Sequence, residues 1–219
     1  MSLTTKALSE RVSDALAFLT GDGFRYFRSF EHFRRDDPHG HSYVHIDSVT
    51  HNRLDYHLTF NIGVRIDTLE STIKQILGQP TELTHYDRSI WNYTANIGPN
   101  SHGWRYPIPG TWTFREAREI DSQLSEVSTF IRELALPFLD RNRTSAAVRE
   151  TLLEFPRHTQ NLKPFQQILG ADVLADDARQ LEADYSLLSE RHAKWHPPLK
   201  AEFNEFYRHA KSFLQARNA

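Results

Sequence analysis

The chain has 219 residues, of which 39% are hydrophobic and 25% charged, and its formal net charge is -2. This composition is typical of a globular protein that buries a core, and the lack of a basic field argues against a nucleic-acid partner. The chain contains no cysteine, which excludes disulfides, thiolate zinc sites and cysteine nucleophiles and is consistent with a reducing compartment.

The N-terminal stretch MSLTTKALSERVSDALAFLTG differs from a signal peptide, because Glu10, Arg11 and Asp14 interrupt its apolar pattern. No stretch of the sequence approaches the roughly 18 apolar residues that a membrane helix needs. We therefore expect a soluble, cytoplasmic protein without a membrane partner.

The first quarter of the chain changes from a helical to a strand-like pattern. Apolar residues at helical spacing predict a helix over residues 3–20. The aromatic stretch GFRYFRSFEHFRR at 23–35 then predicts one or two strands. Strict alternation over 54–66 predicts a long strand, and the same alternation over 41–47 predicts that the two runs form an antiparallel hairpin.

A second helix is predicted to begin at Asp67. Asp67 and Glu70 have the spacing of a capping box, and Gly78 ends the apolar stripe that follows. A further strand is predicted at 88–97, where aromatic and β-branched residues return.

Residues 98–112 are predicted to form a long loop rich in glycine, proline and aromatic residues. Loops of this length in compact domains are often functional. After the loop, Thr113 is predicted to cap a helix that Pro137 ends. The remaining predicted helices cover residues 145–156, 173–194 and 198–216.

Strands in the first half and helices in the second predict an α+β fold. We expect an antiparallel β-sheet of four or five strands with helices on one face, followed by a helical C-terminal half. In domain terms, residues 1–140 are predicted to form the α+β domain and residues 141–219 a helical subdomain packed on it.

The stretch HGHSYVHID at 39–47 raises the question of a metal site. His45 and Asp47 lie on the same strand face, and the predicted hairpin brings His57 within about 5 Å of that pair, measured between Cβ atoms. Two imidazoles and a carboxylate can hold one transition-metal ion, or can supply a general base that an aspartate orients. The pattern favours a third interpretation, an ordinary solvated strand face without a cofactor.

No phosphate-binding loop, metalloprotease helix motif or nucleophile elbow is present, so the sequence favours a non-enzymatic role. Four residues of the long loop are of types that anchor protein interfaces, or they fold back onto the sheet. These residues are Trp104, Arg105, Tyr106 and Trp112. Arginines among the aromatic residues of 23–35 can stack nucleic-acid bases, but neighbouring acids dilute their positive field.

Three blocks, GFRYFRSFEHFRR, LTFNIGVR and ELALPFLDR, resemble a small bacterial domain family of unknown function. The matching residues are Gly23, Phe24, Phe33, Arg34, Asn61, Gly63 and Leu136 to Asp140. The resemblance covers roughly residues 1–140 and implies no catalytic residues. It suggests a protein of immunity type, which neutralises the toxin of a neighbour. We therefore hypothesise a non-enzymatic protein-binding module, with a metal-binding protein or metal-dependent enzyme as the alternative.

Overall fold

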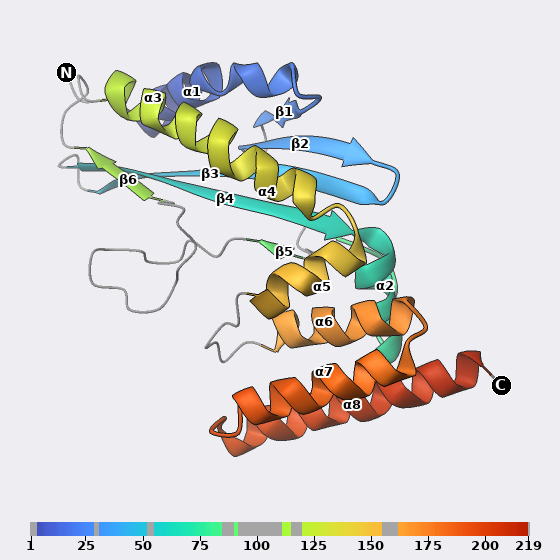
Figure 1. The fold of residues 1–219 in the computed structure, drawn as a ribbon. Helices are drawn as coiled ribbons and strands as arrows, with labels where there is room; N and C mark the ends of the chain where they lie inside the picture. The colour runs from blue at the N-terminus through green and yellow to red at the C-terminus, as the bar shows by residue number, and fades with distance from the viewer. Residues whose placement is uncertain are drawn as a thin grey trace. The chain divides into compact units, whose positions relative to one another are not determined.

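The computed structural model describes residues 4–28, 31–51, 55–84, 90–91, 111–114, 120–154 and 162–218. The fold is α+β, as predicted (Figure 1). Contacts divide the chain into a sheet unit, Met1–Val64 with Trp91–Arg141, and a helical unit, Arg65–Ile90 with Asn142–Ala219. The predicted domains 1–140 and 141–219 remain a prediction, since the first 140 residues contribute to both units.

The strands form one sheet in the order β1-β2-β3-β4-β5, and β6 pairs with β4. Their bounds are β1 Arg25–Phe27, β2 His32–Asp37, β3 Gly40–His51, β4 Asp55–Ile66, β5 Ile90–Trp91 and β6 Thr111–Phe114. The predicted strands at 23–35 are confirmed as β1 and β2, and the predicted strand at 54–66 is confirmed as β4. The prediction of a loop through Trp112 and a helix cap at Thr113 is wrong, because both residues pair with β4.

The helix-covered face of the sheet is apolar. Paired residues of neighbouring strands share a face, and the pairs Tyr26↔Phe33 and Phe33↔Val44 run across β1, β2 and β3. Phe33 and Val44 are buried, and β4 adds the buried Phe60 and Ile62. Figure 1 shows the helices α1 (Thr5–Ala15), α3 (Ile120–Phe130) and α4 (Leu136–Arg141) over one face of this sheet.

Two helix ends in the sheet unit differ from the prediction. The first helix starts at the N-cap Thr4 but ends at Ala15, and a 3₁₀ turn, Ala17–Thr20, follows it. Pro137 does not end the third helix, because α3 continues through a π-helical turn, Ile131–Ala135, into α4. Proline lacks the N–H of a regular helical bond, and a wider π turn before it is one way to accommodate that loss.

The helical unit is built around α6. Its helices are α2 Asp67–Ile76, α5 Ser145–Glu154, α6 Lys163–Leu174, α7 Ala178–Arg191 and α8 Pro197–Arg217. Helix α6 contacts α2, α5, α7 and α8. The sequence analysis misses α6 because this helix is apolar on nearly all sides and so has no stripe. The predicted helix 173–194 is instead the end of α6 and all of α7, which the Asp177 side chain caps.

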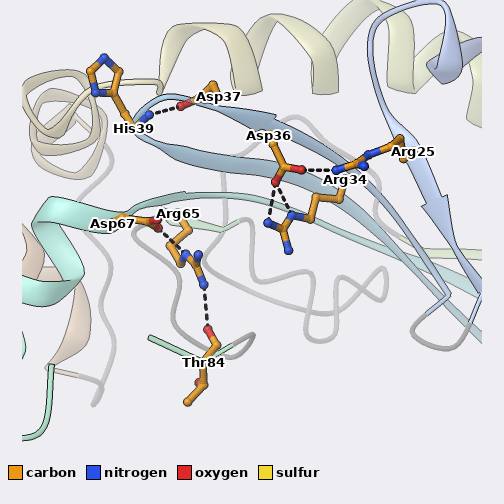
Figure 2. Close-up of polar contacts among 8 residues, drawn as sticks. All are labelled: Arg25, Arg34, Asp36, Asp37, His39, Arg65, Asp67 and Thr84. Atoms are coloured by element: carbon orange, nitrogen blue, oxygen red, sulfur yellow. Dashed lines mark hydrogen bonds and ion pairs between the residues drawn. The ribbon is translucent and has the colours of Figure 1, made fainter. Parts of the chain in front are cut away.

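The predicted capping box of α2 is wrong. Asp67 is the first helical residue, and no side chain caps the helix. The Asp67 carboxylate instead accepts a hydrogen bond of 2.6 Å from Arg65, which also donates to the carbonyl oxygen of Thr84 (Figure 2). Glu70 is buried and pairs with Lys163 of α6 at 3.1 Å. A local partner, Arg65, therefore takes the Asp67 carboxylate away from the helix N-terminus, and a tertiary partner, Lys163, takes that of Glu70.

Candidate binding surface

The face of the sheet opposite the apolar core carries a cluster of charged and aromatic side chains on β1 and β2. The register pairs Arg25 with Arg34 and Phe27 with His32, so these four residues share one face. Asp36 follows Arg34 by two positions and joins them. We call these five residues the platform.

Asp36 connects the two arginines of the platform. Its Oδ2 atom lies 2.5 Å from Arg25 Nη2, and its Oδ1 atom accepts hydrogen bonds from Arg34 Nη2 at 2.5 Å and Nε at 2.6 Å. Figure 2 shows the two guanidinium groups approaching this carboxylate from neighbouring strands. Two nitrogens of Arg34 converge on Oδ1 and Arg25 takes Oδ2, so each oxygen of the carboxylate faces a cation.

Phe27 lies close to both cations. The guanidinium carbons of Arg25 and Arg34 lie 5.7 and 6.0 Å from the centroid of its ring, within cation–π range. On the neighbouring strand, the His32 ring lies 5.3 Å from the same centroid. Phe27 is half-buried, so part of its surface stays accessible beside two positive charges.

The electrostatics of the platform favour binding over acid–base chemistry. Partial burial by itself would raise the pKa of Asp36, but hydrogen bonds from Arg34 and Arg25 outweigh it and hold the pKa below its ordinary value. Asp36 is therefore ionised at neutral pH and is a poor proton acceptor. With two guanidinium groups and one carboxylate, the charged groups of the platform carry a net positive charge.

The histidine stretch is only partly the solvated strand face that its pattern favours. Val44 and Ile46 are buried on the core side as expected, but His41 and Tyr43 on the opposite side are buried too, at 5% and 4% exposure. The Tyr43 ring occupies the space where a side chain at position 63 would stand, and Gly63 of β4 leaves that space open. Glycine in the neighbouring strand thus explains the burial of Tyr43.

The predicted metal ligands lie on adjacent strands, but the structure describes only part of them. His45 is half-buried and faces His32 of β2, a pairing that the sequence analysis does not include. Asp47 lies in β3 and His57 in β4, and their side chains lie outside the described part of the chain. Among the side chains that are described, no group of three His, Asp or Glu residues is placed to hold a metal ion.

The predicted loop anchors are outside what the structure describes. Trp104, Arg105 and Tyr106 fall in the range 92–110, and no placement is given for them. Trp112 lies opposite Leu58 in the pairing of β6 with β4, and only its backbone is described. Their role at an interface stays a prediction.

Sequence reasoning misses the platform because it predicts one or two strands over 23–35 without pairing β1 with β2. A signal for the next pairing, that of β2 with β3, is present in the turn between those two strands, where Pro38 and His39 follow Asp37. The Asp37 side chain accepts a hydrogen bond of 2.8 Å from the His39 backbone N–H (Figure 2), which is the turn chemistry expected of aspartate. This turn fixes the register that places His32 opposite His45.

A hollow in the surface of the sheet unit lies between α1 and the end of β1. It has a volume of about 610 Å³ and is lined by two cationic, three acidic and three hydroxyl-bearing residues. Arg28 donates to Glu10 at 3.1 Å, and Ser9 donates to Glu31 at 2.9 Å. Because much of its charge is matched within the lining, this cleft does not indicate the charge of a ligand.

The helical unit contains a different ionic cluster, which is buried. Arg149 of α5 pairs with Asp172 of α6 at 2.7 Å and with Asp184 of α7 at 2.6 Å. The two carboxylate side chains are 1% and 4% exposed. We call these three residues the buried triad. The two carboxylates lie too deep to touch a partner, and the Arg149 side chain is 19% exposed, so the contacts of the triad serve mainly the packing of the three helices.

Comparison with known proteins adds no relative. No family model matches the chain, no curated protein matches it, and no solved structure matches the fold. Among the residues that the structure describes, no helix combines the length and apolar character required to span a bilayer. The geometry described above is therefore the basis for a functional proposal.

Proposed function

We propose that this protein is a non-enzymatic protein-binding module and that the platform is the centre of its contact surface. The observation that carries the proposal is Phe27, a half-buried aromatic residue within cation–π range of the guanidinium groups of both Arg25 and Arg34. Arginine and aromatic residues are enriched among the few residues that dominate binding energy at protein interfaces. The net positive charge of the platform suits an acidic patch on the partner.

Accessibility supports the same proposal. The Arg25 side chain is 72% exposed and that of Arg34 is 35% exposed, so a partner can reach both. The mutual ion pairs with Asp36 hold the two guanidinium groups in place before binding, which reduces the entropy lost on association. The loop residues Trp104, Arg105, Tyr106 and Trp112 stay predicted as a second part of the surface.

The sequence resembles a small bacterial family of unknown function, and by analogy with bacterial proteins of immunity type we propose a toxin as the partner. A toxin encoded by a neighbouring gene is the first protein to test, since an immunity protein and its toxin are made together. We place the module in the cytoplasm, and the absence of cysteine is consistent with that compartment.

The test compares two phenylalanines of the sheet unit. A photo-crosslinking residue at position 27 identifies the partner, and its affinity is then measured for the wild type, Phe27→Ala and Phe18→Ala. Phe18 is a matched control, because it is also half-exposed and also lies beneath a guanidinium group, that of Arg132 at 3.6 Å. We expect Phe27→Ala to weaken binding about 30-fold or more, the effect of a central interface residue, and Phe18→Ala to change it little.

Equal affinities for the two variants, or no crosslinked protein from position 27, contradict the proposal. Turnover of a substrate by the purified protein contradicts its non-enzymatic part.

The alternative function is metal binding at His45, Asp47 and His57. It is favoured by one observation, that His45 faces His32, which adds an imidazole to the predicted set. The measurement is metal content by mass spectrometry on protein purified without a polyhistidine tag or a metal column. About one zinc, iron or nickel ion per chain, lost in His45→Ala, would replace the binding module with a metal site.

A further inference from the structure

The two carboxylates of the buried triad compete for one hydrogen. The Nε atom of Arg149 lies 2.7 Å from Asp172 Oδ1 and also 2.7 Å from Asp184 Oδ2. Nε carries a single hydrogen, so it cannot make a full hydrogen bond to both oxygens. A proton on one carboxyl group removes the competition, because a protonated carboxyl donates a hydrogen bond to an ionised neighbour.

The hydrogen bonds show which carboxyl group is better suited to carry the negative charge. Asp184 accepts from Arg149 through Oδ2 and from Gln180 through Oδ1, at 2.9 Å. Asp172 Oδ2 is buried and accepts no hydrogen bond from a donor among the described residues. An ionised Asp172 would therefore keep part of its charge on an oxygen without a donor in the protein interior, which is costly. This hydrogen-bond pattern favours a proton on Asp172 that is donated toward Asp184.

Few other charges act on this position. Helix α6 packs against α2, α5, α7 and α8. The charged groups that face Asp172 are Arg149 on α5 and Asp184 on α7. The charged groups that α2 and α8 bring to α6 have other partners: Glu70 pairs with Lys163, and Arg217 donates to a backbone carbonyl near the end of α6. The state of Asp172 therefore depends on the triad and its burial.

The electrostatics agree with this geometry. Burial raises the pKa of Asp172 to about 8, the negative charge of Asp184 and a hydrogen bond with it contribute in the same direction, and Arg149 offsets only part of the effect. An isolated aspartate has a pKa of 3.8. Between these two pKa values, the folded helical unit therefore holds a proton that the unfolded chain has released.

We propose that Asp172 and Asp184 share one proton at neutral pH, and that this proton is a pH-sensitive lock between α5, α6 and α7. The sign follows from the raised proton affinity of the folded state. The folded unit binds more protons than the unfolded chain from about pH 4 to about pH 8, so its stability falls as the pH rises through that window and is constant above it. The packing of α5, α6 and α7 is therefore more stable in mild acid, where the proton is bound, and less stable in mild alkali, where it is lost.

The first measurement is a carbon-13 NMR titration of the aspartate carboxyl groups in the intact protein. One buried carboxyl, assigned to Asp172 by its absence in Asp172→Asn, is expected to titrate well above the ordinary aspartate range. The second is hydrogen exchange of the α6 amides at several pH values, corrected for the intrinsic exchange rate. Opening of α6 is expected to rise up to about tenfold per pH unit in the window, which is the effect of one linked proton.

Two variants separate the lock from general effects of pH. Asp172→Asn imitates the protonated carboxyl and is expected to remove the pH dependence of opening. Glu182→Gln is the matched control, because Glu182 is an acid on α7 with an exposed side chain, and it is expected to leave the dependence unchanged. If Asp172→Asn does not fold, the titration of the wild-type carboxyl groups still decides the question. Titration of every aspartate near its ordinary value, or α6 opening that is independent of pH, overturns the proposal.

Discussion

The platform and the buried triad have opposite ratios of acidic to basic groups, and the platform is exposed to solvent whereas the carboxylates of the triad are buried. In the sheet unit one carboxylate, Asp36, lies between two guanidinium groups near the surface, and its pKa is lowered. In the helical unit one guanidinium group, that of Arg149, lies between two carboxylates in the interior, and the pKa of Asp172 is raised. The distances in the two clusters are nearly the same, so distance does not explain the difference.

The comparison shows that solvent and the ratio of charges decide what an ion cluster does. Water screens the charges of the platform, and exposed ion pairs contribute only about 0–1 kcal/mol to stability. The interior screens the triad much less, and its two acids share one base. The exposed cluster can therefore change with little effect on the fold, which suits a surface that binds, whereas the buried cluster is part of the fold.

The largest difference is expected from removing one arginine in each cluster. Arg149→Ala leaves two acidic side chains in the interior without their cation and should lower the free energy of unfolding by about 3–5 kcal/mol. Arg34→Ala removes an equivalent group near the surface and should cost less than about 1 kcal/mol. Urea unfolding at neutral pH measures both. Similar losses for the two variants would mean that burial does not distinguish the clusters.

A smaller loss of stability is expected from adding a Cβ atom at a tightly packed glycine in each unit. Gly63→Ala places a Cβ atom against the Tyr43 ring, and such overpacking costs about 1–3 kcal/mol. In α6, Gly170→Ala brings a Cβ atom to 2.8 Å from Ile73, but alanine also gains about 1 kcal/mol of helix propensity, so the net loss should be smaller. Thermal unfolding checks the order.

Tyr43→Leu supplies the control for the first of these variants. It removes the ring that crowds position 63, so the cost of Gly63→Ala should shrink in the double variant. If the cost stays the same in the Tyr43→Leu background, the two residues are not coupled and the packing explanation is wrong.

The smallest effect is expected for Asp36. A lowered pKa means that its contribution to stability is present above the unfolded value and is lost as the pH falls through the folded value, in strong acid. Because the side chain is 37% exposed, Asp36→Asn should cost less than about 1 kcal/mol at neutral pH and nothing in strong acid. Unfolding curves at about pH 7 and pH 2 test both parts. A loss of more than 2 kcal/mol would show that the platform holds the sheet together.

The sequence predicts most clearly those elements whose pattern is local. The alternation over 54–66 predicts β4, and the apolar stripe after Asp67 predicts α2. Helix α6 is not predicted, because it is buried on nearly all sides and so shows no one-sided apolar stripe. Burial of that kind depends on helices elsewhere in the chain. The cap of α2 fails for a related reason, because Glu70 finds Lys163 far along the sequence.

The two ionic clusters also differ in how local their sequence pattern is. The platform comes from one stretch of 12 residues, from Arg25 to Asp36, so correct pairing of β1 and β2 would predict most of it. The buried triad joins three helices, and its residues each look like ordinary surface charges of a helix. The signal that remains is Asp172, an acid that follows the apolar Ile168 and Leu169 within a helix that is otherwise buried.

The contact between Gly63 and Tyr43 has a consequence for how this sequence can vary over evolution. Position 63 can accept a side chain only if position 43 loses its ring, and neither change is tolerated well alone. Related sequences should therefore show linked substitutions at these two sites, with glycine accompanying an aromatic residue and a larger residue accompanying a smaller one. An alignment of homologues that shows this covariation would mark β3 and β4 as neighbours without any structure.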